Sequence, residues 1–213
     1  MGEFPTKEKF FSALAGKHGS ELQKRISSSS VAICGLGGLG SNIAAILVRS
    51  GIGMLRLIDF DKVDLSNIGR QQYFMTQTGM YKTDALAENL RTISPYTEIH
   101  TYTERISEEN TSRLIGDCEI VCEAFDRAEE KAMLVNHVLE KMPDKYIVAA
   151  SGMAGISSAN TVTTRKVSSR LYICGDGVSD ISEDGTVFPS RVMICAAHQA
   201  HTVLRIIAGQ YDA

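Results

Sequence analysis

The chain has 213 residues, of which 44% are hydrophobic and 22% are charged. This length and balance are typical of one globular domain with extensions rather than of two domains. The net charge is −3, from 22 Lys and Arg residues against 25 Asp and Glu residues. That charge argues against a protein that coats nucleic acid or an anionic membrane. No apolar run approaches the roughly 18 residues of a membrane span.

The sequence contains five cysteines, and none of them belongs to a C-x-x-C pair. An odd number without such pairs argues against a disulfide framework and favours the reducing cytoplasm. The first residues, MGEFPTKEKFF, lack the apolar core of a signal peptide. We therefore expect a cytoplasmic protein with no membrane partner.

Hydrophobic periodicity predicts strands and helices that alternate along most of the chain. The predicted strands span residues 31–34, 54–58, 98–103, 119–122, 146–150 and 160–165, with a short strand at 171–174 in a Ser- and Gly-rich loop over 167–188. The predicted helices span residues 6–17, 21–26, 41–50, 82–93, 107–115, 126–142 and 192–208. Residues 59–78 have no clear period, and an irregular stretch of that length is usually functional or disordered.

This alternation predicts an α/β fold with a doubly wound, mostly parallel, Rossmann-like sheet. The later strands have no helix between them, which favours an antiparallel edge. We expect a helical arm over residues 1–30 and a nucleotide-binding domain over residues 31–213. The arm has two interpretations, packing against its own domain or contact with a second subunit, and the sequence favours neither.

A glycine-rich turn follows the first predicted strand, in the stretch VAICGLGGLG. Gly35, Gly37 and Gly40 satisfy G-x-G-x-x-G, and Gly38 lies inside the motif. Glycines allow a sharp turn, a close approach of the backbone to phosphate, and tight packing of the next helix on the sheet. That helix directs free N–H groups and the positive end of its dipole at the phosphate. The strand–turn–helix–strand context favours nucleotide binding over a purely structural turn.

Asp59 ends the second strand, 24 residues after Gly35 (59 minus 35). An acidic side chain in that place contacts ribose hydroxyls in dinucleotide folds, so these features alone favour an NAD enzyme. The following loop, DFDKVDLSNIGRQQ, changes that interpretation because it contains Asp61, Asn67 and Arg70. NAD has no terminal triphosphate, so an NAD site has no need of the Lys and Arg side chains that this loop contains.

The stretches GLGGLGS and LIDFDKVDLSNIGRQQ, followed by Lys82 and by Asp126 after a strand, resemble the ThiF/MoeB/HesA family. These proteins are ubiquitin-activating-enzyme-like adenylyltransferases. The resemblance covers about residues 31–165, and the CGD and AAHQA segments are most similar to the compact ThiF-type branch. It implies that residues 31–213 form an adenylyltransferase domain. The implied reaction joins ATP to the C-terminal carboxylate of a small ubiquitin-fold sulfur carrier ending in Gly-Gly.

The resemblance also implies roles for individual residues. Asp59 would hold the ribose, Asn67 and Arg70 would contact phosphates, and Lys82 would add a second positive charge. Asp126 would bind Mg²⁺ and, with Arg70 and Lys82, would belong to the catalytic set. The nucleotide-binding residues implied are Gly35, Gly37, Gly38, Gly40, Asp59, Asp61, Ser66, Asn67, Arg70, Gln71 and Lys82.

Each charged residue also has a simpler interpretation. Asp126 alone would be a helix cap, with Glu129 completing a capping box. Lys82 alone would be a solvated lysine, and Arg70 alone a surface ion pair of little value. Ser66 and Gln71 have a weaker claim, and the Ser66 hydroxyl could serve only to order the loop. In combination and at family spacing, these residues favour the functional interpretation.

The sequence departs from the family in three places. Many relatives bind zinc through two C-x-x-C pairs, but Leu171 replaces one cysteine of the first pair, so we expect no zinc. Cys174 is expected in an open loop, where a thiolate could form a covalent link to the carrier or could be a vestige of the lost pair. The arm has only Arg25 and no R-x-x-R-Q pattern, which puts in doubt an ATP site shared across the expected homodimer. His198 and His201 lie three apart, and a packed or surface role is favoured over a metal pair.

The main functional prediction is adenylation of a ThiS-like carrier in thiamin (thiazole) biosynthesis. The alternative is activation of another carboxylate, on a molybdopterin-synthase-type carrier or a modified tRNA base, although the acidic net charge argues against tRNA. A further alternative is an interaction subunit that binds nucleotide without catalysis. An NAD-dependent oxidoreductase is the most distant alternative.

Overall fold

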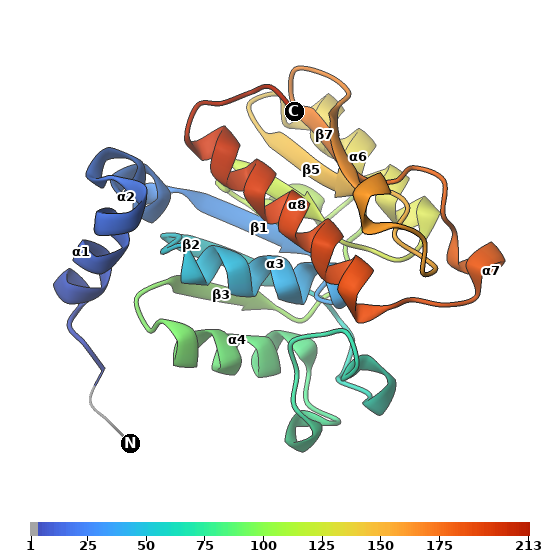
Figure 1. Ribbon diagram of the computed structural model, residues 1–213, viewed down its shortest axis with the longest axis horizontal. Coiled ribbons are helices and arrows are strands. Elements are labelled where there is room, and N and C mark those ends of the chain that lie inside the picture. The colour runs from blue at the N-terminus through green and yellow to red at the C-terminus, as the bar shows by residue number, and fades with distance from the viewer. Residues whose placement is uncertain (1–3) are drawn as a thin grey trace.

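The computed structural model describes residues 4–213 and contains a seven-stranded sheet in the order β3-β2-β1-β4-β5-β7-β6 (Figure 1). The strands are β1 (Ser30–Cys34), β2 (Met54–Ile58), β3 (Glu98–Tyr102), β4 (Ile120–Glu123), β5 (Tyr146–Ala150), β6 (Thr163–Lys166) and β7 (Leu171–Gly175). All neighbouring strands are parallel except β6 and β7, which pair antiparallel at one edge. The predicted fold class is therefore confirmed.

Helices cover both faces of the sheet (Figure 1). One face carries α3 (Gly38–Arg49), α4 (Lys82–Ile93) and α8 (Pro189–Ile207), and the other carries α5 (Thr111–Ile115) and α6 (Ala128–Lys141). The short helix α7 (Ile181–Asp184) lies between β7 and α8. No helix within residues 4–213 is both long and apolar enough to cross a lipid bilayer.

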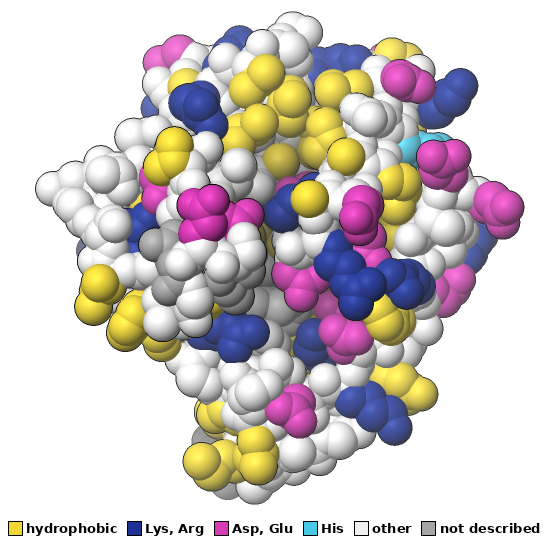
Figure 2. Space-filling view, turned by 90° about the vertical axis from the view of Figure 1, so that its right-hand side faces the viewer, with side chains coloured by type: hydrophobic (Ala, Val, Ile, Leu, Met, Phe, Trp, Pro, Cys, Tyr) yellow, Lys and Arg dark blue, Asp and Glu magenta, His cyan; other side chains and the backbone are white. Residues whose placement is uncertain are grey.

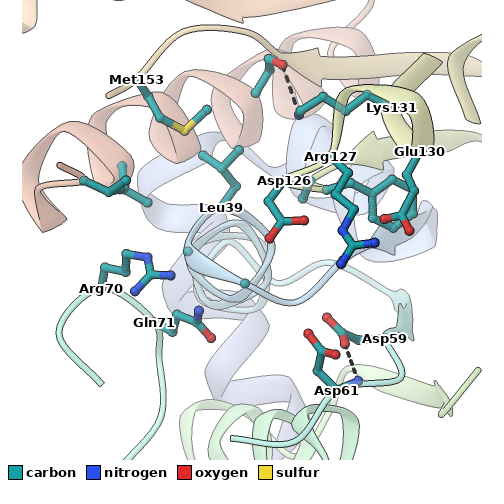
Figure 3. Close-up of a pocket in the computed structure, with 18 of the residues that line it drawn as sticks. Leu39, Asp59, Asp61, Arg70, Gln71, Asp126, Arg127, Glu130, Lys131 and Met153 are labelled. Atoms are coloured by element: carbon teal, nitrogen blue, oxygen red, sulfur yellow. Dashed lines mark hydrogen bonds between the residues drawn. The ribbon is translucent and has the colours of Figure 1, made fainter. Parts of the chain in front are cut away.

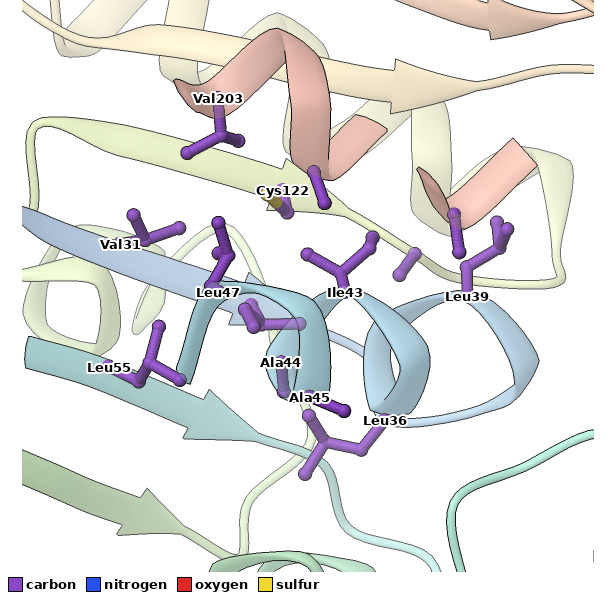
Figure 4. Close-up of a cluster of buried hydrophobic side chains, with 14 of the residues drawn as sticks. Val31, Leu36, Leu39, Ile43, Ala44, Ala45, Leu47, Leu55, Cys122 and Val203 are labelled. Carbon is purple, nitrogen blue, oxygen red and sulfur yellow. The ribbon is translucent and has the colours of Figure 1, made fainter. Parts of the chain in front are cut away.

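The central packing layer joins α3 and α8 to the sheet. Leu39, Ile43 and Leu47 recur every four residues on α3, so they share one face, and all three are buried. Figure 4 shows Ile43 and Leu47 on the side of α3 that faces the α8 residue Val203, which belongs to the same buried cluster. This layer anchors the glycine turn and the start of α8, both of which border the pocket described below.

The N-terminal arm consists of α1 (Lys7–His18) and α2 (Ser20–Ser28), and it contacts the rest of its own chain. The Ile26 side chain lies in the main core. The Gln23 side chain donates a hydrogen bond to the Ser50 carbonyl at 3.2 Å, and Arg25 donates to the Ala208 carbonyl at 3.0 Å. Packing of the arm against its own domain is therefore observed.

Four predicted helix starts are wrong. Helix α3 begins at Gly38 rather than at residue 41, and α8 begins at Pro189 rather than at residue 192. The helix expected from Ser107 begins at Thr111, because the Ser107 N–H donates instead to Asn110 Oδ1 at 2.8 Å in a preceding turn. The capping box predicted for Asp126 and Glu129 is absent, because Arg127 occupies the N-cap position of α6 and makes no side-chain cap. The Asp126 side chain is consequently available for another role.

Candidate active site

A pocket of about 750 Å³ lies at the carboxyl ends of β1, β2, β4 and β5. It is lined by the glycine turn, the segments after β2, β4 and β5, and the beginning of α8. On this face, Lys, Arg, Asp and Glu side chains gather around a hollow (Figure 2). Its size suits a nucleotide, and its position is where parallel α/β sheets bind ligands.

The four motif glycines differ in what a side chain would meet. A Cβ would clash at Gly35, at Gly40 and at Gly38, where it would lie 2.8 Å from Val192 Cγ1, whereas at Gly37 it would meet only Gln71 Nε2 at 3.8 Å. A Cβ on Gly35 would lie 2.7 Å from the Ala124 carbonyl oxygen, and Gly35 has a φ of +91°. A Cβ on Gly40 would lie 1.9 Å from the Gly35 carbonyl oxygen, which leaves no room for any side chain. Gly37 and Gly38 line the pocket, whereas Gly40 does not. The structure thus gives Gly40 a packing role and leaves Gly37 and Gly38 beside the ligand space.

Asp59 ties the end of β2 to the glycine turn. Its Oδ2 accepts the Leu36 N–H at 2.6 Å, and its Oδ1 accepts the Asp61 N–H at 2.8 Å. Burial raises the pKa of Asp59, although Lys82 and these hydrogen bonds oppose the rise. Lys82 Nζ lies 2.8 Å from Asp61 Oδ2 and 4.0 Å from Asp59 Oδ2. Lys82 is therefore not a solvated lysine, since its side chain is 8% exposed and paired.

The loop after β2 brings Asn67, Arg70 and Gln71 to the pocket. Arg70 Nη1 donates to the Ser66 carbonyl at 2.8 Å, but Arg70 has no ionic partner within the described part of the chain. Gln71 is 7% exposed, and its buried Oε1 atom lacks a hydrogen-bond partner. A buried polar atom of this kind at the pocket wall suits a polar ligand.

Ser66 lies outside the set of lining residues. Its hydroxyl donates to Asp64 Oδ1 at 2.7 Å, and Asn67 Oδ1 accepts the Asp64 N–H at 3.0 Å. These bonds order the short 3-10 helix Leu65–Asn67, so Ser66 acts here on the loop and not on the pocket.

Asp126 follows β4 and extends into the pocket beside Arg127, across from Arg70 and Gln71 (Figure 3). Its carboxylate is exposed and has no partner among residues 4–213. Elsewhere in the pocket Asp59 and Asp61 are already bonded to the protein. Asp126 is thus available to a ligand or a cation.

Several pocket residues were not predicted from the sequence. They include the cations Arg105, Arg127 and Lys131, the acids Glu104 and Glu130, the aromatic side chains Phe60 and Phe125, and residues 150–154, 179, 180, 187 and 192. One signal was present for Lys131: it lies four residues after Arg127 on a predicted helix, and so shares a helix face with it. Phe60 lies within the motif stretch DFDKVDLSNIGRQQ but was given no role, and the other residues lie at or after the ends of strands or in α6 or α8, outside any motif.

The prediction that Cys174 lies in an open loop is wrong. Cys174 is in strand β7 and is fully buried, with its Sγ 3.5 Å from Thr164 Oγ1 and 3.9 Å from Thr202 Oγ1. Burial raises the pKa of this thiol, which opposes formation of a thiolate. All five cysteines are buried, and none of them lines the pocket.

Within residues 4–213, the described side chains include no group of three or more His, Cys, Asp or Glu that could hold a metal ion. His198 Nδ1 instead lies 3.0 Å from Thr164 Oγ1. A Mg²⁺ ion needs less from the protein, because one or two carboxylates together with substrate phosphates usually hold it. The free carboxylate of Asp126 fits that requirement.

The fold and the pocket define an α/β nucleotide-binding protein. Its pocket is lined by a glycine turn and by Arg70, which has no ionic partner in residues 4–213. Residues 11–213 match the ThiF family. The chain belongs to the ThiF family.

The relatives that this chain resembles are named for different activities. The chain is 30% identical over 205 residues to the adenylyltransferase and sulfurtransferase UBA4 of Candida glabrata, covering 92% of this chain and 46% of UBA4. It is 31% identical over 154 residues to the tRNA threonylcarbamoyladenosine dehydratase of Haemophilus influenzae, covering 71% and 59%. It is 30% identical over 152 residues to the molybdopterin-synthase adenylyltransferase of that organism, covering 68% and 63%. The chain thus spans less than two thirds of each of these relatives.

Among solved structures, the fold resembles that of the Escherichia coli tRNA N6-threonylcarbamoyladenosine dehydratase TcdA in complex with ATP. The TM-score is 0.85, with 98% of each chain covered and 18% sequence identity. At that identity the similarity shows a shared fold.

Proposed function

We propose that this chain uses ATP to adenylate a carboxylate, forming an acyl-adenylate and pyrophosphate. The observation that carries the proposal is that Arg70 and Asp126, neither of which has an ionic partner in residues 4–213, flank one pocket beside the glycine turn (Figure 3). A cation and an anion left available in this way match a substrate that brings phosphate groups and a bound cation. The names of the UBA4 and molybdopterin-synthase relatives support the same class of reaction.

Each part of ATP would have a suitable wall of the pocket to contact. The glycine turn and the N-terminus of α3 suit the phosphates, since free N–H groups there favour negative charge. Asp59 is held at the end of β2, where a carboxylate accepts bonds from ribose hydroxyls. The unpartnered Oε1 of Gln71 would gain a hydrogen bond from the bound substrate.

The chemistry requires positioning and charge stabilisation rather than a general base. The substrate carboxylate is ionised near pH 7, because an unperturbed terminal carboxyl has a pKa of about 3.5. One of its oxygens forms a bond to the α-phosphorus, and the bond from that phosphorus to the bridging oxygen of pyrophosphate breaks. Arg70 would stabilise the charge that develops on the phosphates, and Lys82 would add to the positive potential. Asp126 would hold Mg²⁺, which neutralises phosphate charge when bound.

For the substrate, we propose the C-terminal Gly-Gly carboxylate of a small ubiquitin-fold sulfur carrier. The family resemblance of residues 31–165 supports this class. The names of the relatives support a molybdopterin-synthase-type carrier better than the ThiS-like carrier of the main sequence prediction. Because no cysteine lines the pocket, the activated acyl group would leave for an external nucleophile rather than for a thiol of this chain.

A carboxylate on a modified tRNA base is the second candidate substrate. It is favoured by the 31% identity to the Haemophilus influenzae tRNA threonylcarbamoyladenosine dehydratase. The net charge of −3 opposes it, since RNA binding relies on basic surface. RNA binding that weakens steeply with added salt would support this candidate over a protein carrier.

Carrier-dependent exchange of labelled pyrophosphate into ATP tests the proposal. The purified chain would be mixed with Mg·ATP and either a ThiS-type or a molybdopterin-synthase-type carrier. The matched control is the same carrier without its two terminal glycines. We expect exchange with an intact carrier and none with the truncated one. Absence of exchange with both carriers, in protein that ATP stabilises against heat, would refute the carrier as substrate while leaving nucleotide binding intact.

A further inference from the structure

The mechanism above leaves unused the ion pair between the buried Glu123 and the half-buried Lys131, although Lys131 borders the pocket. Glu123 ends β4 with its side chain 1% exposed, and Lys131 lies in the first turns of α6 with its side chain 24% exposed. Burying a charged residue at the end of an otherwise apolar strand costs desolvation energy. The presence of Glu123 there therefore calls for an explanation.

The hydrogen bonds of this pair are complete. Lys131 Nζ lies 3.0 Å from each carboxylate oxygen of Glu123 and donates to the Ala150 carbonyl at 3.2 Å, so its three N–H groups have three acceptors. Glu123 Oε1 also accepts the Phe125 N–H at 2.7 Å. From α8, the Gln199 side chain donates to the backbone carbonyls of Glu123 and Val148 at 3.0 and 3.1 Å.

These bonds hold together the two ends of the segment that contains Asp126, residues 123–131. The side chains of Glu123 and Lys131 join the two ends of the segment, and the Lys131 N–H donates to the Arg127 carbonyl at 3.0 Å within it. The bond from Phe125 N–H fixes the turn immediately before Asp126. Asp126 itself makes no side-chain bond to described residues that would hold it. Its direction is therefore set by the backbone that the ion pair fixes.

We propose, on the basis of the proposed function, that Glu123 and Lys131 are positioning residues that aim Asp126 at the bound nucleotide. The bond to Ala150 adds a second effect, because it fixes the end of β5 where residues 150–154 line the pocket. Replacing a buried ion pair by apolar residues is often neutral for stability, so the loss of positioning can be separated from the loss of fold.

The test uses the double variant Glu123→Leu/Lys131→Met in the full chain. The first measurement is amide hydrogen exchange of residues 124–127 without any ligand, which does not depend on the proposed function. We expect these amides to exchange about tenfold faster than in the wild type, because the Phe125 N–H loses its acceptor and the turn loses the ion pair that fixes it. The second measurement is the Mg·ATP concentration that gives half-maximal pyrophosphate exchange, which should rise by a similar factor.

The control is Arg170→Gln, which removes a structural cation far from the pocket. Arg170 donates to the carbonyls of Leu139, Met142 and Lys145, so its loss destabilises the fold without touching the turn at Asp126. Unchanged amide exchange at 124–127 in the folded double variant would overturn the inference. If the double variant fails to fold, Lys131→Gln serves in the same two measurements, with the same expected and overturning results. Absence of carrier-dependent pyrophosphate exchange in the wild type would instead refute the carrier as substrate.

Discussion

Arg70 carries a positive charge that the described protein leaves without an ionic partner. Its guanidinium donates one bond to the Ser66 carbonyl and otherwise faces the pocket. The sequence predicted this residue because N-x-x-R-Q follows D-x-D in a loop of no clear period. The structure adds that Asp61, which also lines the pocket, is already paired with Lys82 at 2.8 Å.

Replacing Arg70 by Ala should lower pyrophosphate exchange by about a hundredfold to a thousandfold, the usual loss for a donor aimed at developing charge. The free energy of unfolding should change little, because the lost bond to Ser66 is solvent-exposed. Arg49→Ala, at the far end of α3, is the charge-matched control and should keep wild-type exchange. Equal exchange rates in the two variants would remove Arg70 from the proposed mechanism.

Cys174 should be dispensable for activity. Cys174→Ala removes a buried thiol that does not line the pocket, so adenylation should proceed at the wild-type rate. The free energy of unfolding should fall by about 1 kcal/mol through lost burial. Loss of adenylation in a variant that melts as a folded protein would restore the covalent role that the structure argues against.

The predicted elements match the observed ones best where periodicity and stop signals agree. The bounds of β2, α4 and β5 are as predicted, since each is an apolar or amphipathic run between residues that end regular structure. The bounds of α5 and the cap of α6 were mispredicted because Ser107 and Asp126 resemble caps locally but bond elsewhere or face the pocket. Cap residues and ligand residues are of the same type, so sequence alone does not separate them.

In the turn that joins β1 to α3, alanine substitutions at Gly40 and at Gly37 should have different effects on folding and on ATP binding. Gly40→Ala should lower the free energy of unfolding by about 3 kcal/mol or abolish folding, because its Cβ would lie 1.9 Å from a backbone oxygen. Gly37→Ala should fold, since its Cβ would meet nothing closer than Gln71 Nε2 at 3.8 Å, but should bind ATP more weakly. Thermal melts with and without ATP check both expectations. A well-folded Gly40→Ala protein would contradict the packing role.

The ion pair of Arg191 and Asp176 joins α8 to the segment after β7, and Arg191 also donates to the Ser157 and Ser158 carbonyls. Burial acts to raise the pKa of Asp176, but N–H groups of Ser179 and Val178 and the Arg191 charge outweigh it and hold that pKa below 3.8. A depressed carboxyl pKa stabilises the fold above pH 3.8, and this contribution disappears as the pH falls through the folded-state value.

Asp176→Asn should therefore lower the free energy of unfolding by about 3 kcal/mol at pH 7, since it leaves Arg191 buried and unpaired. The difference from the wild type should shrink below pH 3.8. Denaturant titrations at several pH values measure both quantities. A difference that stays constant from pH 7 down to pH 3 would contradict the assigned ion pair.

At the scale of the whole molecule, the pocket collects residues from segments distant in sequence. The parallel-sheet prediction brings Asp59, Arg70 and Asp126 to one edge, because ligands gather at the carboxyl ends of strands. Residues 150–154, 179, 180, 187 and 192 complete the pocket through the pairing of β5 with β7 and the placement of α8. Those contacts depend on long-range packing, which leaves no local pattern in the sequence.

Intact-protein mass spectrometry of the chain incubated with Mg·ATP and an intact Gly-Gly carrier tests the central claim most directly. We predict that the carrier gains the mass of one AMP unit and that the chain itself stays unmodified. Hydroxylamine should release the AMP unit, because an acyl-adenylate is a reactive mixed anhydride. Detection of no carrier adenylate with either carrier type, under conditions where ATP binds, would contradict the claim.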